Sequence, residues 1–437
     1  MIEYLHSVTL QEDKCVGCTD CIKRCPTEAI RVRHGKAKII DERCIDCGLC
    51  IKVCRNRAKK AMTDKLDCLS EYKYKVAIPA PTLYAQFKDI YDVNVILTGL
   101  KQLGFDEVFE VSRAAEIVTE ESKKLLKSSN LKKPVISSAC PVIIRLIQIR
   151  FPELIEHILP VISPMEVAAR IVKNDLIKRG IDEKDIGVFF ISPCAAKATN
   201  ARNPIGIEKS HVDKVLSIKE VYKKLAGTLK RLDKIENLRT SSYDGIRWAM
   251  SGGEGKGLEI DNFIAVDGIE NVIKVLEEVE NGKLVNVDFI EGLACTGGCL
   301  GGPLTVENSF VAKNKLKKVL KNTLEEKAGD CANLHTEDIT LFWNKEVLSK
   351  PVMSLDEDMN IAIKKMEELE RIYEQLPQID CGSCGAPNCR ALAEDIVRNN
   401  ANIEDCIFML RKKVREMAED MVALAQKIPA SLNNKDF

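Results

Sequence analysis

Short apolar runs alternate with amphipathic helical patterns through the middle of the chain, from about residue 75 to residue 350. Apolar residues at helical spacing predict helices over 112–127 and 270–279. The apolar runs between such patterns predict strands, and they are KVAIPA (75–80), KPVIS (133–137), IGVFFIS (186–192), NFIAV (262–266) and VNVDFI (285–290). This alternation predicts a two-lobed α/β domain with mixed or parallel sheets.

Different patterns mark the two ends of the chain. Near the amino terminus, AIRVRHGKAKII alternates around His34-Gly35 and predicts a β-hairpin. Near the carboxyl terminus, apolar residues recur at a 4-3-4-3-4-3-4 spacing: Ile403, Ile407, Leu410, Val414, Met417, Met421, Leu424 and Ile428. This stripe favours either a coiled coil that joins a homodimer, with Asn400 extending it, or an amphipathic helix packed on its own domain.

Length and charge narrow the class of protein. A chain of 437 residues has room for roughly two to four domains, and we expect divisions at 1–70, 71–350 and 351–437. The net charge is zero, so neither nucleic acid nor a membrane surface is an expected partner. The first residues lack the pattern of a signal peptide, and charged residues interrupt the most apolar stretch, 142–162. We therefore expect a cytoplasmic protein, in which eighteen cysteines favour metal binding over disulfides.

Two cysteine runs with one spacing lie in the first 70 residues. CVGCTDCIKRC (15–25) and CIDCGLCIKVC (44–54) both read C-x2-C-x2-C-x3-C, the pattern of two-cluster bacterial ferredoxins. In that pattern the fourth cysteine of each run binds the other run's [4Fe-4S] cluster. The expected ligand sets are Cys15, Cys18, Cys21 and Cys54 for one cluster, and Cys44, Cys47, Cys50 and Cys25 for the other. Zinc is the alternative, although zinc ribbons use two separated pairs. The pattern predicts electron transfer within a ferredoxin-like α+β domain.

Four further cysteines follow predicted strands in the central domain. Cys140 lies in SSACP, Cys194 in SPCAAK, and Cys295 and Cys299 in EGLACTGGCLGGP. Four thiolates from three loops suit a cubane cluster, and the glycines at 297, 298, 301 and 302 would let the backbone approach a bulky cofactor. The alternative is that these are ordinary buried core cysteines.

The order SSACP, SPCxxK and LACxxGCxxGP, after a two-cluster ferredoxin domain, resembles the [FeFe]-hydrogenase family over residues 1 to 410. The resemblance implies that Cys140, Cys194, Cys295 and Cys299 hold the cubane of an H-cluster. Cys299 would also bridge to a diiron unit that carries CO, cyanide and an azadithiolate, and Lys197 would hydrogen-bond a cyanide. The implied reaction is the reversible cleavage of H2 into two protons and two electrons.

Several residues depart from the family's pattern. Ala139 stands where efficient members have a proton-donating cysteine, Asn200 replaces a glutamate, and Ser192 and Leu293 each replace a methionine. On the helix where the family keeps its proton-relay carboxylates, the chain has Glu120 and Glu121, with Lys124 near the second relay position. A missing proton donor predicts slow turnover. This set resembles the sensory [FeFe]-hydrogenases, which are thought to report H2.

A last cysteine set, Cys381, Cys384, Cys389 and Cys406, predicts one further cluster. Its place after the hydrogenase domain resembles the extra [4Fe-4S] module of sensory members, here in a small helical domain, and zinc is the alternative. Cys68 and Cys331 remain, and we interpret them as ordinary thiols. None of the five histidines lies in a metal-spaced motif.

The resulting hypothesis is a slow [FeFe]-hydrogenase that acts as a sensor of H2 or of redox state. Expected partners are H2, protons, a redox protein such as ferredoxin, and a separate signalling protein such as a kinase or phosphatase. Sensory relatives usually continue into an output domain, so a chain that stops at Phe437 suggests a short form or a truncated one. One alternative is a catalytic or electron-bifurcating subunit, and another is a non-enzymatic iron-sulfur protein similar to hydrogenase-like assembly factors, without a diiron unit.

Overall fold

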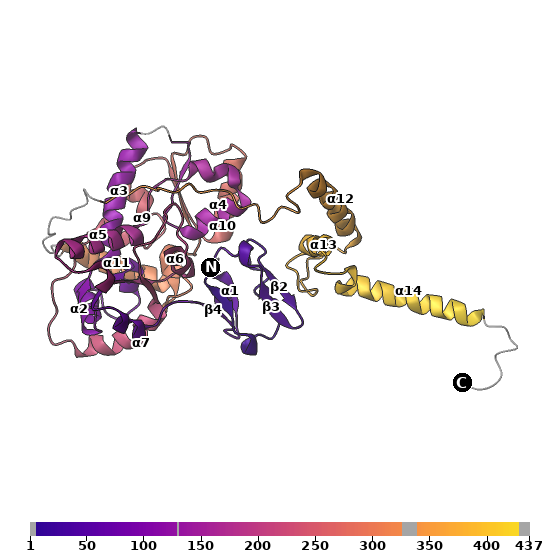
Figure 1. Cartoon of the computed structure of the whole chain (residues 1–437), viewed down its shortest axis with the longest axis horizontal. Coiled ribbons are helices and arrows are strands. Elements are labelled where there is room, and N and C mark those ends of the chain that lie inside the picture. The colour runs from indigo at the N-terminus through magenta and orange to yellow at the C-terminus, as the bar shows by residue number, and fades with distance from the viewer. Residues whose placement is uncertain (1–5, 129–130, 326–338, 428–437) are drawn as a thin grey trace. The chain divides into compact units, whose positions relative to one another are not determined.

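The computed structural model describes residues 6–128, 131–325 and 339–427 (Figure 1). The described chain forms two compact units. The first contains the described residues up to 9, with 41–52 and 59–351; the second contains 10–40, 53–58 and the described residues from 352 onward. Segments of the amino-terminal region thus belong to both units, and the expected division of the chain at residues 70 and 350 stays a prediction.

Two parallel sheets form the frame of the first unit. One has the order β6-β5-β8-β9, and the other has the order β10-β11-β7. The strands are β5 (Tyr74–Pro79), β6 (Glu107–Val108), β7 (Val135–Ile136), β8 (Ile186–Ser192), β9 (Lys214–Ser217), β10 (Phe263–Asp267) and β11 (Phe289–Leu293). Every predicted strand overlaps one of these, whereas β6 and β9 were not predicted. The run 285–290 becomes a strand only from Phe289, and Val285 is exposed.

Helices pack around these sheets. Predicted helices 112–127 and 270–279 correspond to α3 and α10. The α-helices of this unit are α2 (Val93–Gln102), α3 (Val111–Ser128), α4 (Pro141–Arg150), α5 (Pro164–Lys178), α6 (Ala195–Arg202), α7 (Ile218–Thr228), α8 (Tyr243–Arg247), α9 (Gly253–Gly257), α10 (Ile269–Glu280) and α11 (Ser309–Glu325). Short 3-10 helices are η2 (Asp41–Arg43), η3 (Leu66–Glu71), η4 (Pro81–Ala85), η5 (Pro152–His157), η6 (Glu183–Asp185), η7 (Leu229–Arg231) and η8 (Gly298–Gly301).

Strand β8 separates two hydrophobic cores. All seven of its residues are buried, with Val188 and Phe190 in one core and Phe189 and Ile191 in the other. Successive side chains of a strand point to opposite faces of its sheet, so an uninterrupted apolar run is what a strand covered on both faces needs. The IGVFFIS pattern therefore fixes β8 at the centre of the unit.

The second unit combines a ferredoxin-type hairpin with the carboxy-terminal helices. The hairpin pairs β2 (Ile30–Arg33) with β3 (Lys36–Ile39) in antiparallel register, as predicted. Beside it in the unit are η1 (Glu12–Lys14), α12 (Met359–Gln375), α13 (Cys389–Val397), η9 (Ile403–Asp405) and α14 (Ile407–Gln426). Three more elements lie where the chain passes between units: β1 (Val8–Leu10), which pairs with β4 (Lys59–Ala61), and α1 (Leu49–Val53).

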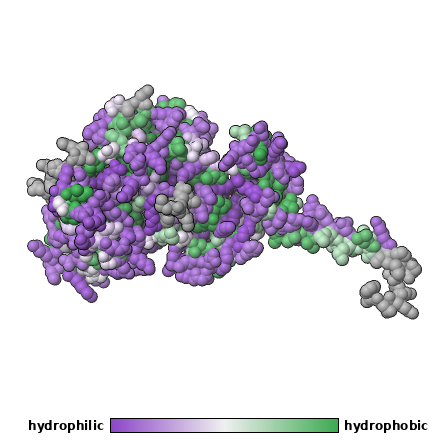
Figure 2. Space-filling view, viewed as in Figure 1, coloured by the Kyte–Doolittle hydropathy of each residue, from purple (hydrophilic) through white to green (hydrophobic). Residues whose placement is uncertain are grey.

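Helix α14 is shorter than the predicted stripe. It begins at Ile407, after Cys406 as its N-cap, whereas Ile403 lies in η9 and packs against the core of the helical module. The extension of the stripe back to Ile403 and Asn400 is therefore wrong, and Ile428 lies outside the described residues. From Ile407 onward none of the helix is buried, and apolar residues are visible along it (Figure 2).

The expected fold class is confirmed as a mixed α/β multidomain protein with a ferredoxin-like amino-terminal region, an α/β domain and a helical carboxy-terminal region. Across the described parts of the chain, no helix combines the length and the apolar character that crossing a membrane requires.

Candidate active site and metal centres

Three strand ends of the first unit bring four cysteines toward one cavity. Cys140 follows β7, Cys194 follows β8, and Cys295 follows β11. Cys140 and Cys194 are also the N-cap residues of α4 and α6. A helix N-terminus stabilises negative charge, which favours a thiolate. The parallel sheets thus place these cysteines at carboxyl ends of strands, the usual position of ligand sites in open α/β sheets.

The cavity has a volume of about 110 Å³, and Cys140, Cys194, Cys299 and Lys197 contribute to its wall. Burial, together with the neighbouring thiolates, raises the pKa of the Cys194 thiol to about 11 and that of Cys299 to about 12. Burial, together with Cys194, Cys140 and Cys299, also raises the pKa of Cys295. The four sulfurs therefore act on one another electrostatically. Positive metal ions are what would allow four such thiolates to ionise together, so the donor set fits an iron-sulfur cluster.

Lys197 is the cation of this site. Burial lowers the pKa of its ammonium group, and the thiolates of Cys194, Cys140 and Cys299 oppose that shift. A lysine with a desolvated head is suited to hydrogen-bond an anionic group inside the cavity. The family resemblance implied that Lys197 would hydrogen-bond a cofactor ligand, and its place in the cavity wall agrees with that role.

The remaining wall is mostly apolar. Ala139 and Leu293 line the cavity, together with Met165, Phe190 and Trp248. Ser192 does not line it: its hydroxyl group accepts a hydrogen bond from the Cys194 backbone N–H at 3.0 Å and so holds the turn that carries this ligand. Asn200 is also away from the wall, and its Oδ1 accepts a hydrogen bond from Ile205 N. Ser192 therefore contacts the site only through the backbone of Cys194.

The glycines of the third motif lie against other backbone segments of the protein. A Cβ at Gly298 would lie 2.8 Å from Ser251 N, and one at Gly302 would lie 2.3 Å from Pro193 O. At Gly301 it would lie 2.1 Å from Thr296 O. These glycines allow protein backbone segments to approach one another, so the loops of two cysteine motifs can pack together. Close approach of these glycines to a cofactor stays a prediction.

Two buried carboxyl groups line the same cavity, Glu254 from α9 and Glu291 from β11. Burial and the Glu291 carboxylate raise the pKa of Glu254 to about 8, although Ser137 donates a hydrogen bond to Glu254 Oε2 at 2.6 Å. Burial also raises the pKa of Glu291, which accepts hydrogen bonds from Gly252 N and Gly255 N. Two carboxyl groups that repel each other cannot both ionise easily, so the pair retains a proton near neutral pH.

The second cysteine run contacts the third motif within the first unit. Lys52, between Cys50 and Cys54 in the sequence, donates a hydrogen bond to Gly301 O at 2.9 Å. A Cβ at Gly48 would lie 2.5 Å from the side chain of Pro303. The loop of Cys44, Cys47 and Cys50 therefore packs directly on the loop of Cys295 and Cys299.

The two amino-terminal runs have the same backbone. Gly17 and Thr19 of the first run have φ of 66° and 64°, and the corresponding Asp46 and Gly48 have 58° and 73°. The final cysteines also match: Cys25 Sγ accepts a hydrogen bond from Ala29 N, and Cys54 Sγ accepts one from Ala58 N, both at 3.2 Å. The internal repeat of the sequence is thus a repeat of structure. The assignment of ligands to the two clusters stays a prediction.

The carboxy-terminal cysteines lie together in the second unit. Cys389 and Cys406 are buried, and Gly382 and Gly385 have left-handed backbones in the loop of Cys381 and Cys384. Burial raises the pKa of the Cys384 thiol, and Cys381 and Cys406 raise it further. The effect of Cys381 and Cys406 on Cys384 shows that these three lie near one another, as expected for ligands of one metal cluster.

Comparison with known families decides the class of this chain. The model described as iron only hydrogenase large subunit, C-terminal domain, matches residues 73–256 and 222–303. The chain belongs to this family. A 4Fe-4S dicluster domain matches residues 7–55 of this hydrogenase-family chain, and a model for an Fe-S cluster matches residues 376–408. The last match covers Cys381, Cys384, Cys389 and Cys406.

Known hydrogenases are distant relatives of this chain. It is 26% identical to iron hydrogenase 1 of Clostridium pasteurianum over 73% of this chain and 68% of that one. It is 27% identical to the periplasmic [Fe] hydrogenase large subunit of Nitratidesulfovibrio vulgaris over 68% of this chain and 86% of that one. An apo variant of the [FeFe]-hydrogenase HydA1 from Chlamydomonas reinhardtii has the same fold, with a TM-score of 0.50 and 18% identity over 64% of this chain and 95% of that one.

The expected relay carboxylates of α3 do not reach the cavity. Glu120 pairs with Lys123 at 3.0 Å and Glu121 with Lys124 at 3.2 Å. The α3 residues that line the cavity are Val111 and Ala115. Neither Glu120 nor Glu121 lines the cavity, and their role as relay carboxylates stays a prediction. They form surface ion pairs.

The sequence reasoning missed Glu254 and Glu291 as cavity residues. A signal was present for Glu291, since it interrupts the apolar run that leads into LAC. Glu254 had no such signal, because it lies among glycines in SGGEGKG. Cys331 and His335 lie outside the described residues.

Proposed function

We propose that this chain catalyses the reversible cleavage of H2 into two protons and two electrons in its central cavity. The observation that carries the proposal is the convergence of cysteines from three strand ends: Cys140, Cys194 and Cys299 line an apolar cavity with Lys197 in its wall, and Cys295 lies near enough for their charges to raise its pKa. When bound by these cysteines, a cubane joined to a diiron unit would supply the site at which H2 is split.

The residues of the chain would supply position, dryness and proton transfer. Lys197 would hydrogen-bond an anionic ligand in the cavity, and Ser192 would fix the loop of Cys194. Ala139 cannot carry a proton. In its place the chain has Glu254, which lines the same cavity and can hold a proton near neutral pH. We therefore propose Glu254, with Glu291 beside it, as the group that exchanges protons with the site.

We further propose that turnover is slow and that the chain reports H2 or redox state. Support comes from the alanine at position 139 and from α3, whose acidic residues at 120 and 121 form surface ion pairs. A proton that two buried glutamates share is also transferred less directly than a proton on a thiol beside the cofactor. Electrons would pass to the iron-sulfur clusters and then to a redox partner such as ferredoxin, or would change the state seen by a separate signalling protein such as a kinase or phosphatase.

We also propose that a second copy of the chain covers α14. The helix has no buried residue, and six of its apolar residues continue the 4-3 spacing: Ile407, Leu410, Val414, Met417, Met421 and Leu424. Ile407 and Val414 occupy the a positions, and Leu410 and Leu424 occupy the d positions. β-branched residues at a with leucine at d favour a parallel two-stranded coiled coil.

Infrared spectroscopy on protein loaded with the diiron unit tests the proposed reaction. CO and cyanide bands that shift between argon and H2 are the expected result. Bands that do not respond to H2 would contradict H2 cleavage. Failure to load the diiron unit, with the other clusters intact, would favour the non-enzymatic alternative. Fast turnover with a dye would contradict the sensor proposal and favour a catalytic or bifurcating subunit.

A further inference from the structure

The hairpin of the second unit contacts two cysteine sites, one on each edge. On the β3 edge, Ala37 N donates a hydrogen bond to Cys15 Sγ at 3.4 Å. On the β2 edge, Val32 N donates a hydrogen bond to Gly385 O at 2.8 Å, in the loop that follows Cys384. Cys15 belongs to the first ferredoxin-type run, and Cys384 belongs to the carboxy-terminal set.

Val32 and Ala37 are directly opposite each other in the hairpin register. Their N–H groups point outward, as in the pairs of an antiparallel ladder that do not exchange hydrogen bonds, whose Cα atoms lie roughly 4.5 Å apart. One strand spacing and two hydrogen bonds therefore separate Cys15 from the loop of Cys384. Electron tunnelling decays steeply across empty space and less steeply through bonds, so this is an efficient path.

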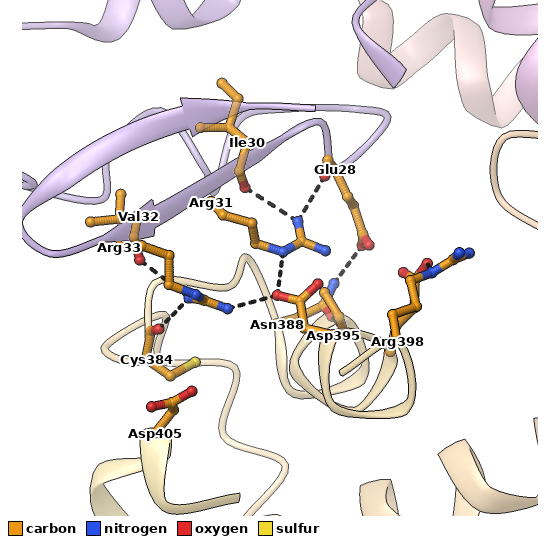
Figure 3. A network of polar contacts seen from close by, with 12 residues as sticks. Glu28, Ile30, Arg31, Val32, Arg33, Cys384, Asn388, Asp395, Arg398 and Asp405 are labelled. Atoms are coloured by element: carbon orange, nitrogen blue, oxygen red, sulfur yellow. Dashed lines mark hydrogen bonds and ion pairs between the residues drawn. The ribbon is translucent and has the colours of Figure 1, made fainter. Parts of the chain in front are cut away.

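Polar contacts hold the two edges in place (Figure 3). Asp395 accepts hydrogen bonds from Arg31 Nε and from Arg33, both at 2.7 Å, and the Asp395 and Arg31 side chains are almost fully buried. Arg33 also donates a hydrogen bond to Cys384 O at 2.7 Å. Arg31 and Arg33 thus join the hairpin to helix α13 and to Cys384 of the carboxy-terminal cysteine set.

A second contact connects the same two sites. Lys23 lies between Cys21 and Cys25 in the first run, and its Cε lies 3.0 Å from the position of a Cβ on Gly382. Asn388 Nδ2 donates a hydrogen bond to Glu28 Oε1 at 2.6 Å. The carboxy-terminal loop therefore packs on the loop of the first run as well as on the hairpin.

From these contacts we infer that the carboxy-terminal site exchanges electrons directly with the cluster of Cys15, across the β2–β3 hairpin. In each transfer one electron leaves one cluster and reduces the other, and no bond is made or broken. This inference rests on the proposed function for the source of electrons, H2, and on the binding of a cluster at each cysteine set. It makes the carboxy-terminal cluster the end of the electron path within this chain.

Electron paramagnetic resonance of the full chain, reduced with dithionite, tests the coupling without any use of H2. We expect the signal of the carboxy-terminal cluster to be broadened by the reduced cluster of Cys15. Cys18→Ala, which removes a ligand of that cluster, should leave a narrow, slowly relaxing carboxy-terminal signal. Cys68→Ala is the control, because Cys68 belongs to none of the cysteine sets. An unchanged signal in Cys18→Ala would overturn the inference, as would unchanged iron content in Cys381→Ala.

Two glycines of one loop provide a matched pair of variants. At Gly385 a Cβ would lie 1.9 Å from Val32 O, which is backbone, whereas at Gly382 it would meet the flexible end of Lys23. Both residues have left-handed backbones, with φ of 81° and 77°. Gly385→Ala should therefore push the loop away from the hairpin and weaken the coupling, whereas Gly382→Ala should keep it. Equal coupling in the two variants, at equal iron content, would overturn the path through the hairpin.

A second experiment reduces the protein with H2 in place of dithionite. Under H2 we expect the carboxy-terminal cluster to become reduced in the unaltered chain and reduced several-fold more slowly in Cys18→Ala. Equal rates would overturn the inference. If H2 reduces none of the clusters while dithionite still shows the coupling, the proposed function fails and the electron path stands.

Discussion

Replacement of Glu254 by glutamine should make the stability of the hydrogenase domain less dependent on pH. Glu254 is 4% exposed, and burial together with Glu291 raises its pKa from 4.5 to about 8. A group whose pKa is raised in the folded state stabilises the fold at acidic pH and loses this contribution as the pH rises through the folded pKa. At about 1.4 kcal/mol per pKa unit, full ionisation of Glu254 costs the fold roughly 5 kcal/mol, an upper value because Glu291 shares the charge.

The assay is the thermal midpoint of the Glu254→Gln variant and of the unaltered chain, measured from pH 5 to pH 9 without cofactor. Glutamine has the same shape, can keep the hydrogen bond with Ser137, and carries no charge. We expect similar midpoints near pH 5 and a higher midpoint for the variant near pH 9. Glu120→Gln is the control, because the Glu120 side chain is exposed on α3. Parallel pH profiles of Glu254→Gln and the unaltered chain would refute the reasoning.

The same variant tests the proposed proton path when the cofactor is present. A positioned proton donor commonly contributes about 10² to 10⁴-fold in rate, so Glu254→Gln should lower H2 turnover by a factor in that range. Infrared bands of an intact cofactor would show that the loss is in proton transfer. Turnover that equals that of Glu120→Gln would contradict the role of Glu254.

Three further variants test other parts of the proposal. Ala139→Cys should raise H2 turnover, because a thiol at this wall position can carry a proton; unchanged turnover with intact infrared bands would contradict this. Cys299→Ala should abolish binding of the diiron unit, measured by infrared spectroscopy, while the iron of the ferredoxin-type clusters remains; retained bands would refute the bridging role. Leu410→Glu should convert a dimer to a monomer in light scattering, whereas Lys412→Glu, on the opposite face of α14, should not; a Leu410→Glu variant with unchanged mass would exclude the coiled coil.

The sequence by itself determined which cysteines are the candidate metal ligands of this protein. Cysteine spacing is local and chemically specific, so the runs 15–25 and 44–54 predict their clusters without a fold, and the repeated left-handed positions at 17 and 46 agree with the repeat. The apolar run of β8 likewise predicts a strand covered on both faces. Every side chain of such a strand is buried, so polar residues do not alternate with apolar ones.

Only the tertiary structure decided which side chains face the central cavity. Glu254 and Glu291 are 37 residues apart and meet because α9 packs on β11, which no local pattern contains. The same holds for Glu120, whose position on α3 depends on which face of the helix packs inward. The contacts on the two edges of the hairpin were also decided by the tertiary structure. Val32 bonds to Gly385 and Ala37 bonds to Cys15, and neither partner is a sequence neighbour. Spacing along the chain specifies which ligands are present, and packing specifies which groups surround them.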